Sequence, residues 1–462
     1  MASLFPRLSP RPAAAASRSL RLVALTVGLV AAAASAAAMA PVQRVVSPGG
    51  IEAWLMEARE VPLITVRLSF EGGALQDPEG KYGTAIMAAY MFNESAGPLA
   101  VDEFTRRLAR MGAGIFANTG FERFTVSFST PTAHKDEAFE LLRLAFNAPR
   151  FDDEPMLRAR REYLTRLDVA DKNPSSVGSQ ALHRHLFGRH RMGDWIIGTR
   201  EGLHSIGPAD LEAYRRRVLT RSNVKVSVVG DIDARALGPL LDRLLQDLPA
   251  KAELRPVPAP AAASGTCQVI AANIPQAIVQ FAALTPRLTW RQQLADGILQ
   301  SILGDQTTTS RLFLEVRAKR GLVYGISTAR TDYADFSIFS GSFGAKMGDV
   351  AEAMAVTRSE LRRMVEEGPT EQEVADVKRA AVGGILLGLN TGAALADLLV
   401  SLQVDERPIT ILDDFAGEIE KVTRQDVWDV AKLMLDPDRL AVTIVGGPPQ
   451  AGLCDQLGVH RR

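Results

Sequence analysis

An internal repeat constrains the fold of this chain more than any other feature of its sequence. The segment Asn223–Asp231, NVKVSVVGD, corresponds to Arg439–Gly447, RLAVTIVGG, at an offset of 216 residues. Nearer the start of each copy, Val61–Phe70, VPLITVRLSF, corresponds to Ile274–Ala283, IPQAIVQFAA, at an offset of 213. Units of this length are too long for a solenoid repeat, so the sequence predicts one fold used twice.

A Pro/Ala-rich stretch separates the two copies. Residues 248–266, LPAKAELRPVPAPAAASGT, have no hydrophobic periodicity, which is typical of a semi-extended linker. A chain of 462 residues is too long for one ordinary core, so two domains are expected. The resulting division is a leader at 1–40, a first domain at 41–247, a linker at 248–266, a second domain at 267–449 and a tail at 450–462.

Each copy mixes strand and helix patterns. Val61–Phe70 alternates and is rich in β-branched residues, and Ile115–Phe128 predicts two strands around a turn. Gly83–Phe92 is apolar on every side, which indicates a buried helix, and in the second copy Thr370–Glu373 forms a capping box at a helix start. We therefore expect an α+β fold: two homologous domains, each a mostly antiparallel sheet with a helical layer.

The first residues have the layout of a signal peptide. The first 51 residues contain no Asp or Glu, and four Arg residues precede the apolar run Leu22–Ala40. Small-x-small cleavage sites occur at Ala34–Ala36 and Ala38–Ala40. We expect a periplasmic or otherwise exported protein that does not contact the membrane once the leader is removed. A mitochondrial transit peptide and an uncleaved membrane anchor are the alternatives.

Charge and cysteine content narrow the possible functions further. The 53 basic and 53 acidic residues balance, and no basic run or aromatic-interleaved patch suggests a nucleic-acid partner. The two cysteines, Cys267 and Cys454, have neither CxxC spacing nor a nearby His. In an oxidising compartment they could form one disulfide, but separate buried thiols are the preferred interpretation.

The run Ser310–Tyr324, SRLFLEVRAKRGLVY, is the most patterned segment of the chain. Its apolar residues fall at helical spacing, Gly321 ends the helix, and a β-prone segment follows. Arg317 and Tyr324 lie seven residues apart across this break. On spacing alone, the simpler interpretation is an amphipathic helix with a solvated Arg.

Preceded by Leu303–Asp305 and Thr307–Thr309, this run resembles the C-terminal-domain signature of the insulinase/pitrilysin-type zinc peptidases, the inverzincin class. The resemblance extends over about Val42–Pro448. It implies two homologous α+β domains that enclose a chamber. It also implies that an Arg and a Tyr, here Arg317 and Tyr324, reach the catalytic chamber of the other domain or subunit, where the Tyr helps to hold the substrate and the oxyanion.

The zinc-binding motif of that family is absent. Its first domain carries H-x-x-E-H on a helix, where two His bind metal and the Glu activates water. The flanks of this helix survive as Gly83–Ala85 and Met91–Phe92, but the five motif positions hold Ile86, Met87, Ala88, Ala89 and Tyr90. Zinc needs N, O or S donors, and hydrolysis needs a base, so these residues are a degenerate zinc motif.

The third ligand of the family, a Glu, is missing as well. The Asn173–Pro174 dipeptide sets the register and places Ala159 and Arg166 at the two acidic positions. An Arg at the ligand position repels a cation. A slip of one or two residues would offer Glu162, but one Glu cannot hold zinc without the two His.

A run of three histidines offers another metal site to consider. Within Ala181–Gly193, His183 and His185 point to different sides of the expected helix, and His190 resembles a turn found in family members whatever their activity. We therefore expect no metal in this chain.

These observations lead to a hypothesis and two alternatives. We expect a non-catalytic subunit, a pseudoenzyme, of an exported heterodimeric zinc peptidase, with no cofactor of its own. Zinc is then held by a catalytic homologue that carries H-x-x-E-H, and a peptide is the substrate, extended along the strand edge Gly112–Thr119. Phe116 replaces an Asn that is typical of active members at this edge. The alternatives are a stand-alone peptide-binding or scaffold protein of the same fold and, less favoured, a peptidase with a relocated site.

Overall fold

The computed structural model describes residues 40–260, 265–305, 308–388, 391–447, 452–457 and 460–461. The expected leader lies outside these residues except for Ala40, and so do Thr307, four linker residues and five of the thirteen tail residues. The chain divides into two units, Met1–Pro41 and Val42–Arg462. The fold described below is that of the second unit.

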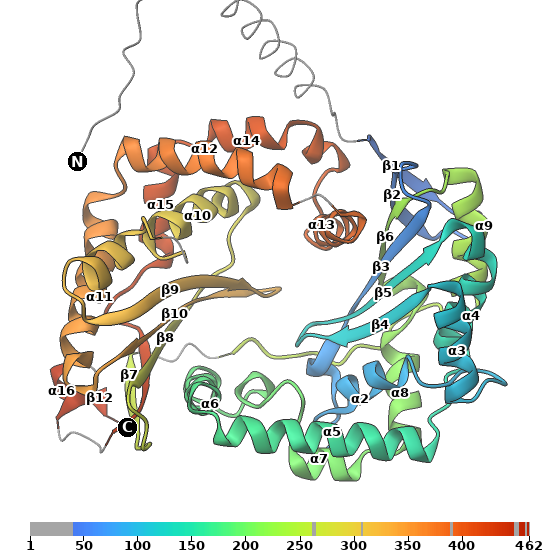
Figure 1. The fold of residues 1–462 in the computed structure, drawn as a ribbon, viewed down its shortest axis with the longest axis horizontal. Coiled ribbons are helices and arrows are strands. Elements are labelled where there is room, and N and C mark those ends of the chain that lie inside the picture. The colour runs from blue at the N-terminus through green and yellow to red at the C-terminus, as the bar shows by residue number, and fades with distance from the viewer. Residues whose placement is uncertain are drawn as a thin grey trace, which may run out of the picture. The chain divides into compact units, whose positions relative to one another are not determined.

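The first sheet draws its strands from residues before the linker. It has six strands in the order β1-β2-β6-β3-β5-β4 (Figure 1). The β2–β6 pair is parallel and the other four pairs are antiparallel. The strands are β1 (Val42–Val46), β2 (Glu52–Glu57), β3 (Leu63–Glu71), β4 (Gly114–Thr119), β5 (Arg123–Pro131) and β6 (Val224–Gly230).

The second sheet repeats this arrangement. Its order is β12-β7-β11-β8-β10-β9, so five neighbouring strands, β7-β11-β8-β10-β9, match β2-β6-β3-β5-β4 of the first sheet. Arg67 faces Ser227 across β3 and β6, and Gln280 faces Thr443 across β8 and β11, at the offsets found in the sequence. The strands are β7 (Thr266–Ile270), β8 (Ala277–Pro286), β9 (Val323–Asp332), β10 (Phe336–Ala345), β11 (Ala441–Val445) and β12 (His460–Arg461).

The predicted α+β duplication is therefore confirmed. The helices before the linker are α2 (Thr84–Met91), α3 (Val101–Met111), α4 (Lys135–Asn147), α5 (Asp153–Lys172), α6 (Pro174–Phe187), α7 (Arg200–Ser205), α8 (Pro208–Val218) and α9 (Ala234–Leu245). Those after it are α10 (Trp290–Leu303), α11 (Val350–Glu367), α12 (Glu371–Gly388), α13 (Gly392–Val404), α14 (Phe415–Lys421), α15 (Arg424–Met434) and α16 (Leu453–Gln456). Among the described residues, no helix has both the length and the apolar character needed to cross a bilayer.

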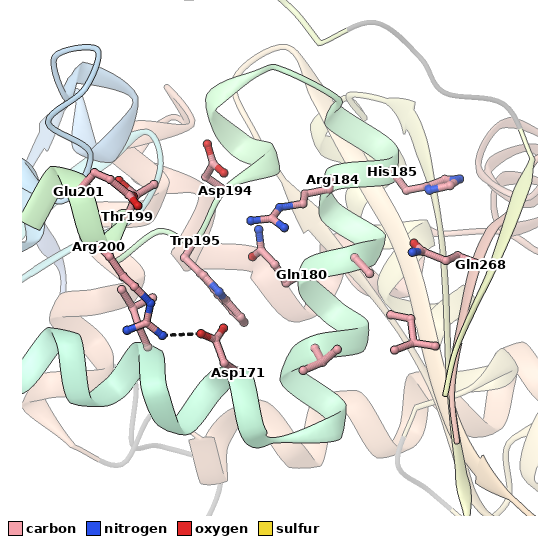
Figure 2. Close-up of a pocket in the computed structure, with 15 residues that line it drawn as sticks. Asp171, Gln180, Arg184, His185, Asp194, Trp195, Thr199, Arg200, Glu201 and Gln268 are labelled. Carbon is pink, nitrogen blue, oxygen red and sulfur yellow. Dashed lines mark hydrogen bonds and ion pairs between the residues drawn. The ribbon is translucent and has the colours of Figure 1, made fainter. Parts of the chain in front are cut away.

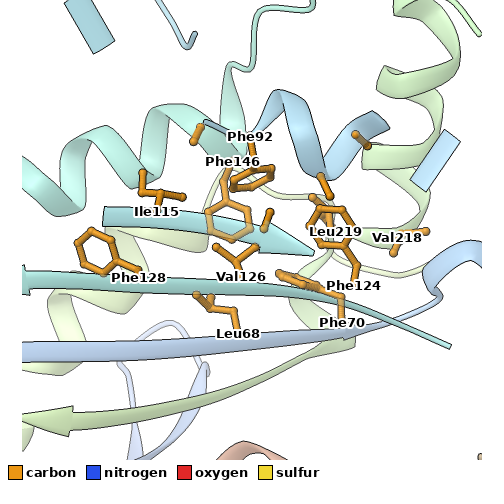
Figure 3. Close-up of a cluster of buried hydrophobic side chains, with 14 of the residues drawn as sticks. Leu68, Phe70, Phe92, Ile115, Phe124, Val126, Phe128, Phe146, Val218 and Leu219 are labelled. Carbon is orange, nitrogen blue, oxygen red and sulfur yellow. The ribbon is translucent and has the colours of Figure 1, made fainter. Parts of the chain in front are cut away.

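Aromatic side chains fill the core between the first sheet and its helices. Alternate residues of β5 are buried, so Phe124, Val126 and Phe128 all point into this core (Figure 3). The ring of Phe92, just after α2, meets that of Phe146 on α4 edge to face, with 4.8 Å between centroids. Removing one such buried ring typically costs about 3–5 kcal/mol, so this cluster fixes α2 against the sheet.

Each sheet also packs against a helix from the other half of the sequence. Helix α13, from the second half, lies on β3 and β6 of the first sheet. There the Ser227 hydroxyl donates a hydrogen bond to the carbonyl oxygen of Ala396 at 2.6 Å. The side-chain amide of Gln403 donates to the carbonyl oxygen of Val226 at 2.7 Å. These contacts give backbone and side-chain polar groups buried partners at the junction.

Helix α6, from the first half, makes the matching contact with β8 and β11. The amide of Gln280 donates to the carbonyl oxygen of Ser175 at 3.3 Å. At Gly178 an added Cβ would lie 2.6 Å from Oε1 of Gln280 and 3.0 Å from Cγ2 of Val445, so glycine permits the close approach of helix and sheet. The two halves therefore exchange helices reciprocally.

The structure corrects the expectation of separate thiols. Cys267 on β7 and Cys454 on α16 form a disulfide with 5.6 Å between their Cα atoms. Strand β12 pairs in parallel with β7 beside it. The sequence could not indicate this bond, because the two residues are 187 positions apart and meet only once the second sheet has formed.

Candidate functional site

Helix α2, which carries the degenerate motif, is anchored at its start by a buried carboxylate. Asp77 accepts hydrogen bonds from the backbone N–H groups of Gly83 and Ala85, each at 2.8 Å. Arg191 pairs with Asp77 at 3.3 Å, and its guanidinium lies over the ring of Tyr82. Burial raises the pKa of Asp77 despite these partners. The contacts that anchor this helix are thus present, although the metal-binding residues of the motif are absent.

The motif positions themselves offer no metal donor set. Ile86 and Ala89 are buried apolar side chains, and Tyr90 is half-buried. The hydroxyl of Tyr163, on α5, donates to the carbonyl oxygen of Ile86 at 3.4 Å. The ring of Tyr90 packs edge-on against that of Tyr163, with 6.0 Å between centroids. Aliphatic side chains stand at the positions of the first His and the base, and an aromatic ring stands at the position of the second His.

Arg166 joins this cluster from α5. Its guanidinium lies 5.2 Å from the ring centroid of Tyr163 and pairs with Glu162 at 2.5 Å. Glu162, the acid that a slipped register would offer, therefore already forms an ion pair with Arg166. A second cation, Arg158, has its pKa raised by its hydrogen bond to Tyr90 and its pairing with Glu94. These residues do not fit a zinc ion, because the motif positions lack its usual ligands and two guanidinium cations lie close by.

The histidine run gives no metal centre either. Burial lowers the pKa of His183, and its ring packs edge to face against Phe187 at 5.9 Å. Nδ1 of His190 accepts a hydrogen bond from the backbone of Met192 at 3.3 Å. Within the described ranges, no group of three or more His, Cys, Asp and Glu residues is placed to hold a metal ion.

Arg317 lies on an irregular helical turn that the spacing did not predict. Residues Phe313–Ala318 form a π-helix, in which the N–H of Lys319 donates to the carbonyl oxygen of Leu314, five residues back, at 3.0 Å. Gly321 then takes a left-handed conformation, with φ at 66°, and its N–H donates to the carbonyl oxygen of Arg317. Single π turns of this kind occur frequently at functional sites.

Tyr324 lies on a second irregularity, a β-bulge. Ile326 faces Phe343 and Val323 faces Ala345, so Tyr324 and Gly325 together oppose the single residue Gly344. A bulge breaks the alternation of a strand and redirects a side chain. On β9, an edge strand, the bulge places two exposed residues in succession, Tyr324 at 64% exposed and Gly325, between the buried Val323 and Ile326.

The two side chains meet at the surface. The guanidinium carbon of Arg317 lies 5.8 Å from the ring centroid of Tyr324. Glu315 is occupied by Lys319 at 2.6 Å and Arg320 at 2.8 Å. Among the described residues no acidic partner pairs with Arg317, so its guanidinium remains available to an incoming group.

The structure groups the predicted site residues into two sets. Ile86, Tyr90 and Arg166 come together around Tyr163, and Arg317 meets Tyr324. No hydrogen bond, ion pair or ring contact joins the two sets within the part of the chain that the structure describes. Sequence reasoning missed Tyr163, whose only signal was its place one turn before Arg166.

Two hollows are lined in part by residues that directly follow members of these sets in the sequence, Gly325 after Tyr324 and Leu167 after Arg166. One of about 400 Å³ lies beside Tyr324 and is lined by small and apolar residues, Gly325, Ser327, Ser342, Gly344, Ile278 and Phe313 among them. The other, of about 610 Å³, lies between α5, α6 and β7 (Figure 2). In the second, Gln180 and Arg184 extend from α6 toward Trp195, and Arg200 is held by Asp171 at 2.5 Å.

The predicted substrate edge is a free strand edge. Strand β4 is the last strand of the first sheet, and its residues alternate between exposed and buried. Phe116 is 61% exposed on it. An unpaired edge is a template for an added strand, and a large apolar side chain there changes which segments it accepts.

Comparison with known proteins identifies the family to which the chain is similar. Residues 55–200 match the family described as Insulinase (Peptidase family M16), and residues 205–381 match the family's Peptidase M16 inactive domain. The chain is 21% identical over 387 residues to the Non-peptidase homolog YmxG of Helicobacter pylori, covering 83% of this chain and 89% of that protein. It is 25% identical to an uncharacterized zinc protease of Streptomyces coelicolor, covering 62% of this chain and 64% of that protein.

Solved structures share the fold. A peptidase M16 inactive domain from Pseudomonas fluorescens superimposes with a TM-score of 0.82 at 23% identity, covering 88% of this chain and 98% of that one. A protease from Helicobacter pylori gives a TM-score of 0.77 at 18% identity, covering 89% of this chain and all of that one. The two family matches together span most of the chain, so this protein belongs to peptidase family M16. Within the family it is a non-catalytic member that lacks the H-x-x-E-H motif.

Proposed function

We propose that this protein is the non-catalytic subunit of an exported heterodimeric zinc peptidase, to which it contributes Arg317 and Tyr324. The proposal rests on the contrast between the degenerate motif and the Arg317–Tyr324 pair. Ile86, Ala89 and Tyr90 hold no metal donors, while the exposed Arg317–Tyr324 pair stands on two backbone irregularities with no acidic partner among the described residues. Strained or irregular backbone clusters at active sites and ligand-binding sites, where the unusual conformation is part of the mechanism.

In this proposal the chemistry is divided between two chains. A homologue with an intact H-x-x-E-H motif holds zinc and activates water. Arg317 and Tyr324 donate hydrogen bonds to the scissile carbonyl as its oxygen gains negative charge. Such donors act more strongly on the transition state than on the ground state, so they raise turnover.

Two observations support export. The leader is free of acidic residues and ends in small residues, as in signal peptides. The Cys267–Cys454 disulfide suits an oxidising compartment such as the periplasm, since cytosolic thiols are kept reduced.

The test is reconstitution of the pair. The mature chain would be co-expressed with a zinc-bearing homologue from the same genome, and the eluate from a sizing column assayed with an unfolded peptide. We expect co-elution and peptide cleavage by the pair, and none by this chain alone. A homologue that cleaves equally well without this chain would contradict the proposal.

A peptide-binding or scaffold protein without a catalytic partner is the second candidate. The free edge of β4, with Phe116 exposed on it, favours this candidate because strand addition needs no catalytic group. Binding of a fluorescent unfolded peptide to the isolated chain, together with failure to pair with any zinc-bearing homologue, would favour it over the first.

A further inference from the structure

Glu315 forms ion pairs with two cationic side chains, Lys319 and Arg320, that lie near the Arg317–Tyr324 pair in the sequence. Its side chain is 13% exposed, and its carboxylate accepts from Lys319 at 2.6 Å and from Arg320 at 2.8 Å. Arg320 also donates to the backbone carbonyl oxygen of Glu315 at 2.7 Å. The bonds from Lys319 and Arg320 lower the pKa of Glu315, so the carboxylate stays charged.

The π-helix explains how one carboxylate holds two consecutive cations. In a π turn the backbone hydrogen bond spans five residues instead of four, so residues four and five positions after Glu315 both come to lie over it. In an α-helix the residues three and four positions on are the neighbours, so Lys319 would face Glu315 well but Arg320, five positions on, would not. Arg317, two positions on, points to another side and lies against Tyr324.

We propose that Glu315 is a positioning residue: by holding Lys319 and Arg320, it leaves Arg317, among the described residues, as the one uncommitted cation beside Tyr324. This inference rests on the proposed function. Without the Glu315 charge, three cations within four residues repel one another, and Arg317 moves away from Tyr324. A donor that is displaced from the developing oxyanion stabilises it less.

The first test measures the reconstituted pair with Glu315→Gln, which keeps the shape of the side chain but removes its charge. A whole oxyanion donor is worth roughly a hundred- to a thousandfold in turnover, so partial displacement should lower kcat about tenfold and change KM by less than about twofold. Glu366→Gln is the matched control, because Glu366 is exposed on α11 and pairs with no described residue; it should leave kcat unchanged.

Rescue separates positioning from a structural role. In Glu315→Gln/Lys319→Gln/Arg320→Gln the two competing cations are gone, and kcat should return to within about threefold of the wild type. A triple variant as slow as Glu315→Gln, or a Glu315→Gln variant with normal kcat, would overturn the proposal.

If Glu315→Gln does not fold, Lys319→Gln/Arg320→Gln tests the same point. Removing the cations that Glu315 restrains should leave kcat near the wild-type value. A loss of about tenfold or more in this double variant would show that the cations are needed in place, and the proposal would fail.

A measurement on the isolated chain keeps this inference separate from the proposed function. Phenylglyoxal modification followed by mass spectrometry reports the reactivity of each Arg. We expect Arg317 to react faster than Arg320 in the wild type, and Arg320 to react up to about fivefold faster in Glu315→Gln, because its ion pair is lost. An unchanged Arg320 rate would overturn the proposal even if the pair is active. If the pair is inactive, the proposed function fails, and this rate still decides the role of Glu315.

Discussion

The ring of Tyr90 stands edge-on to the ring of Tyr163, 6.0 Å away, at the position that the family motif gives to its second histidine. Arg166 covers the other side of this arrangement by stacking on Tyr163. Aromatic contacts and a guanidinium thus surround the degenerate motif, and edge-to-face pairs of this kind stabilise by about 0.5–1.5 kcal/mol beyond area burial.

The purified mature protein should contain far less than one zinc per chain and should cleave no peptide alone, because no side chain at 86, 89 or 90 can bind metal or act as a base. Elemental analysis after gel filtration checks this expectation. About one tightly bound zinc per chain, with proteolysis that a chelator abolishes, would contradict it.

Restoring the motif alone should not restore zinc binding. In Ile86→His/Ala89→Glu/Tyr90→His the guanidinium of Arg166 still lies on the ring of Tyr163, which packs on residue 90, and we expect its charge to oppose the ion. Adding Arg166→Glu removes this charge and supplies a carboxylate, so zinc affinity by calorimetry should appear only in the fourfold variant. Equal affinity in both variants would mean that Arg166 does not obstruct the site.

Tyr324→Phe should slow the reconstituted pair without affecting its assembly. The change removes one exposed hydroxyl, and loss of a single oxyanion donor typically costs roughly a hundred- to a thousandfold in turnover. Tyr333→Phe is the control, since Tyr333 stacks on Phe336 at 5.0 Å as part of the packing. Wild-type turnover by assembled Tyr324→Phe would make Tyr324 a surface residue without a catalytic role.

Replacing both cysteines by serine should destabilise the second half of the molecule. The bond closes a sequence separation of 187 residues, and the chain-entropy estimate for such a loop is up to about 5 kcal/mol. Urea unfolding of the wild type, with and without a reducing agent, and of Cys267→Ser/Cys454→Ser measures the effect. Matching midpoints in all three samples would show that the disulfide does not form or does not stabilise.

Stability should fall between pH 4.5 and pH 2 through Glu373. Burial of this carboxyl raises its pKa, but hydrogen bonds from Arg311 and Thr370 outweigh burial and lower the value from 4.5 to about 2. The unfolded chain therefore takes up the proton first as pH falls, and the stabilisation is complete only above pH 4.5. After allowance for solvent screening we expect a loss of roughly 1–2 kcal/mol across this window. Glu373→Gln should flatten the pH dependence of unfolding, and an unchanged slope would argue against the ion pair.

The contact between α6 and the second sheet can be tested at Gly178. Gly178→Leu places a side chain where Gln280 and Val445 already lie, so it should cost about 1–3 kcal/mol by overpacking. Gly297 on α10 has no neighbour within 4 Å of an added Cβ, and Gly297→Leu should instead stabilise by roughly 0.5–1 kcal/mol through helix propensity. Opposite shifts of the two urea midpoints are expected, and equal shifts would refute the contact.

Local patterns made much of the fold predictable. Alternation identified the strand that begins at Leu63, and the capping box placed the start of α12, where the backbone N–H of Thr370 donates to Glu373 at 2.7 Å. The 213- and 216-residue offsets anticipated the matched registers of the two sheets.

The features that the sequence could not predict depend on the three-dimensional arrangement of the chain. The Cys267–Cys454 bond and the packing of Tyr163 on Tyr90 join residues that no local pattern links. The π turn beneath Arg317 and the bulge at Tyr324 keep the residue types of an ordinary helix and strand, so only hydrogen-bond geometry reveals them.

The exchange of helices between the halves has a consequence for how the protein is made. The last strand of the first sheet ends at Gly230, but α13, which packs on that sheet, begins only at Gly392. At about 5–20 residues per second the ribosome needs roughly ten to thirty seconds to supply it. During that interval the nascent first half exposes the sheet surface that Ala396 and Leu399 later bury. A chaperone that keeps the chain unfolded until α13 has emerged would protect this surface from aggregation.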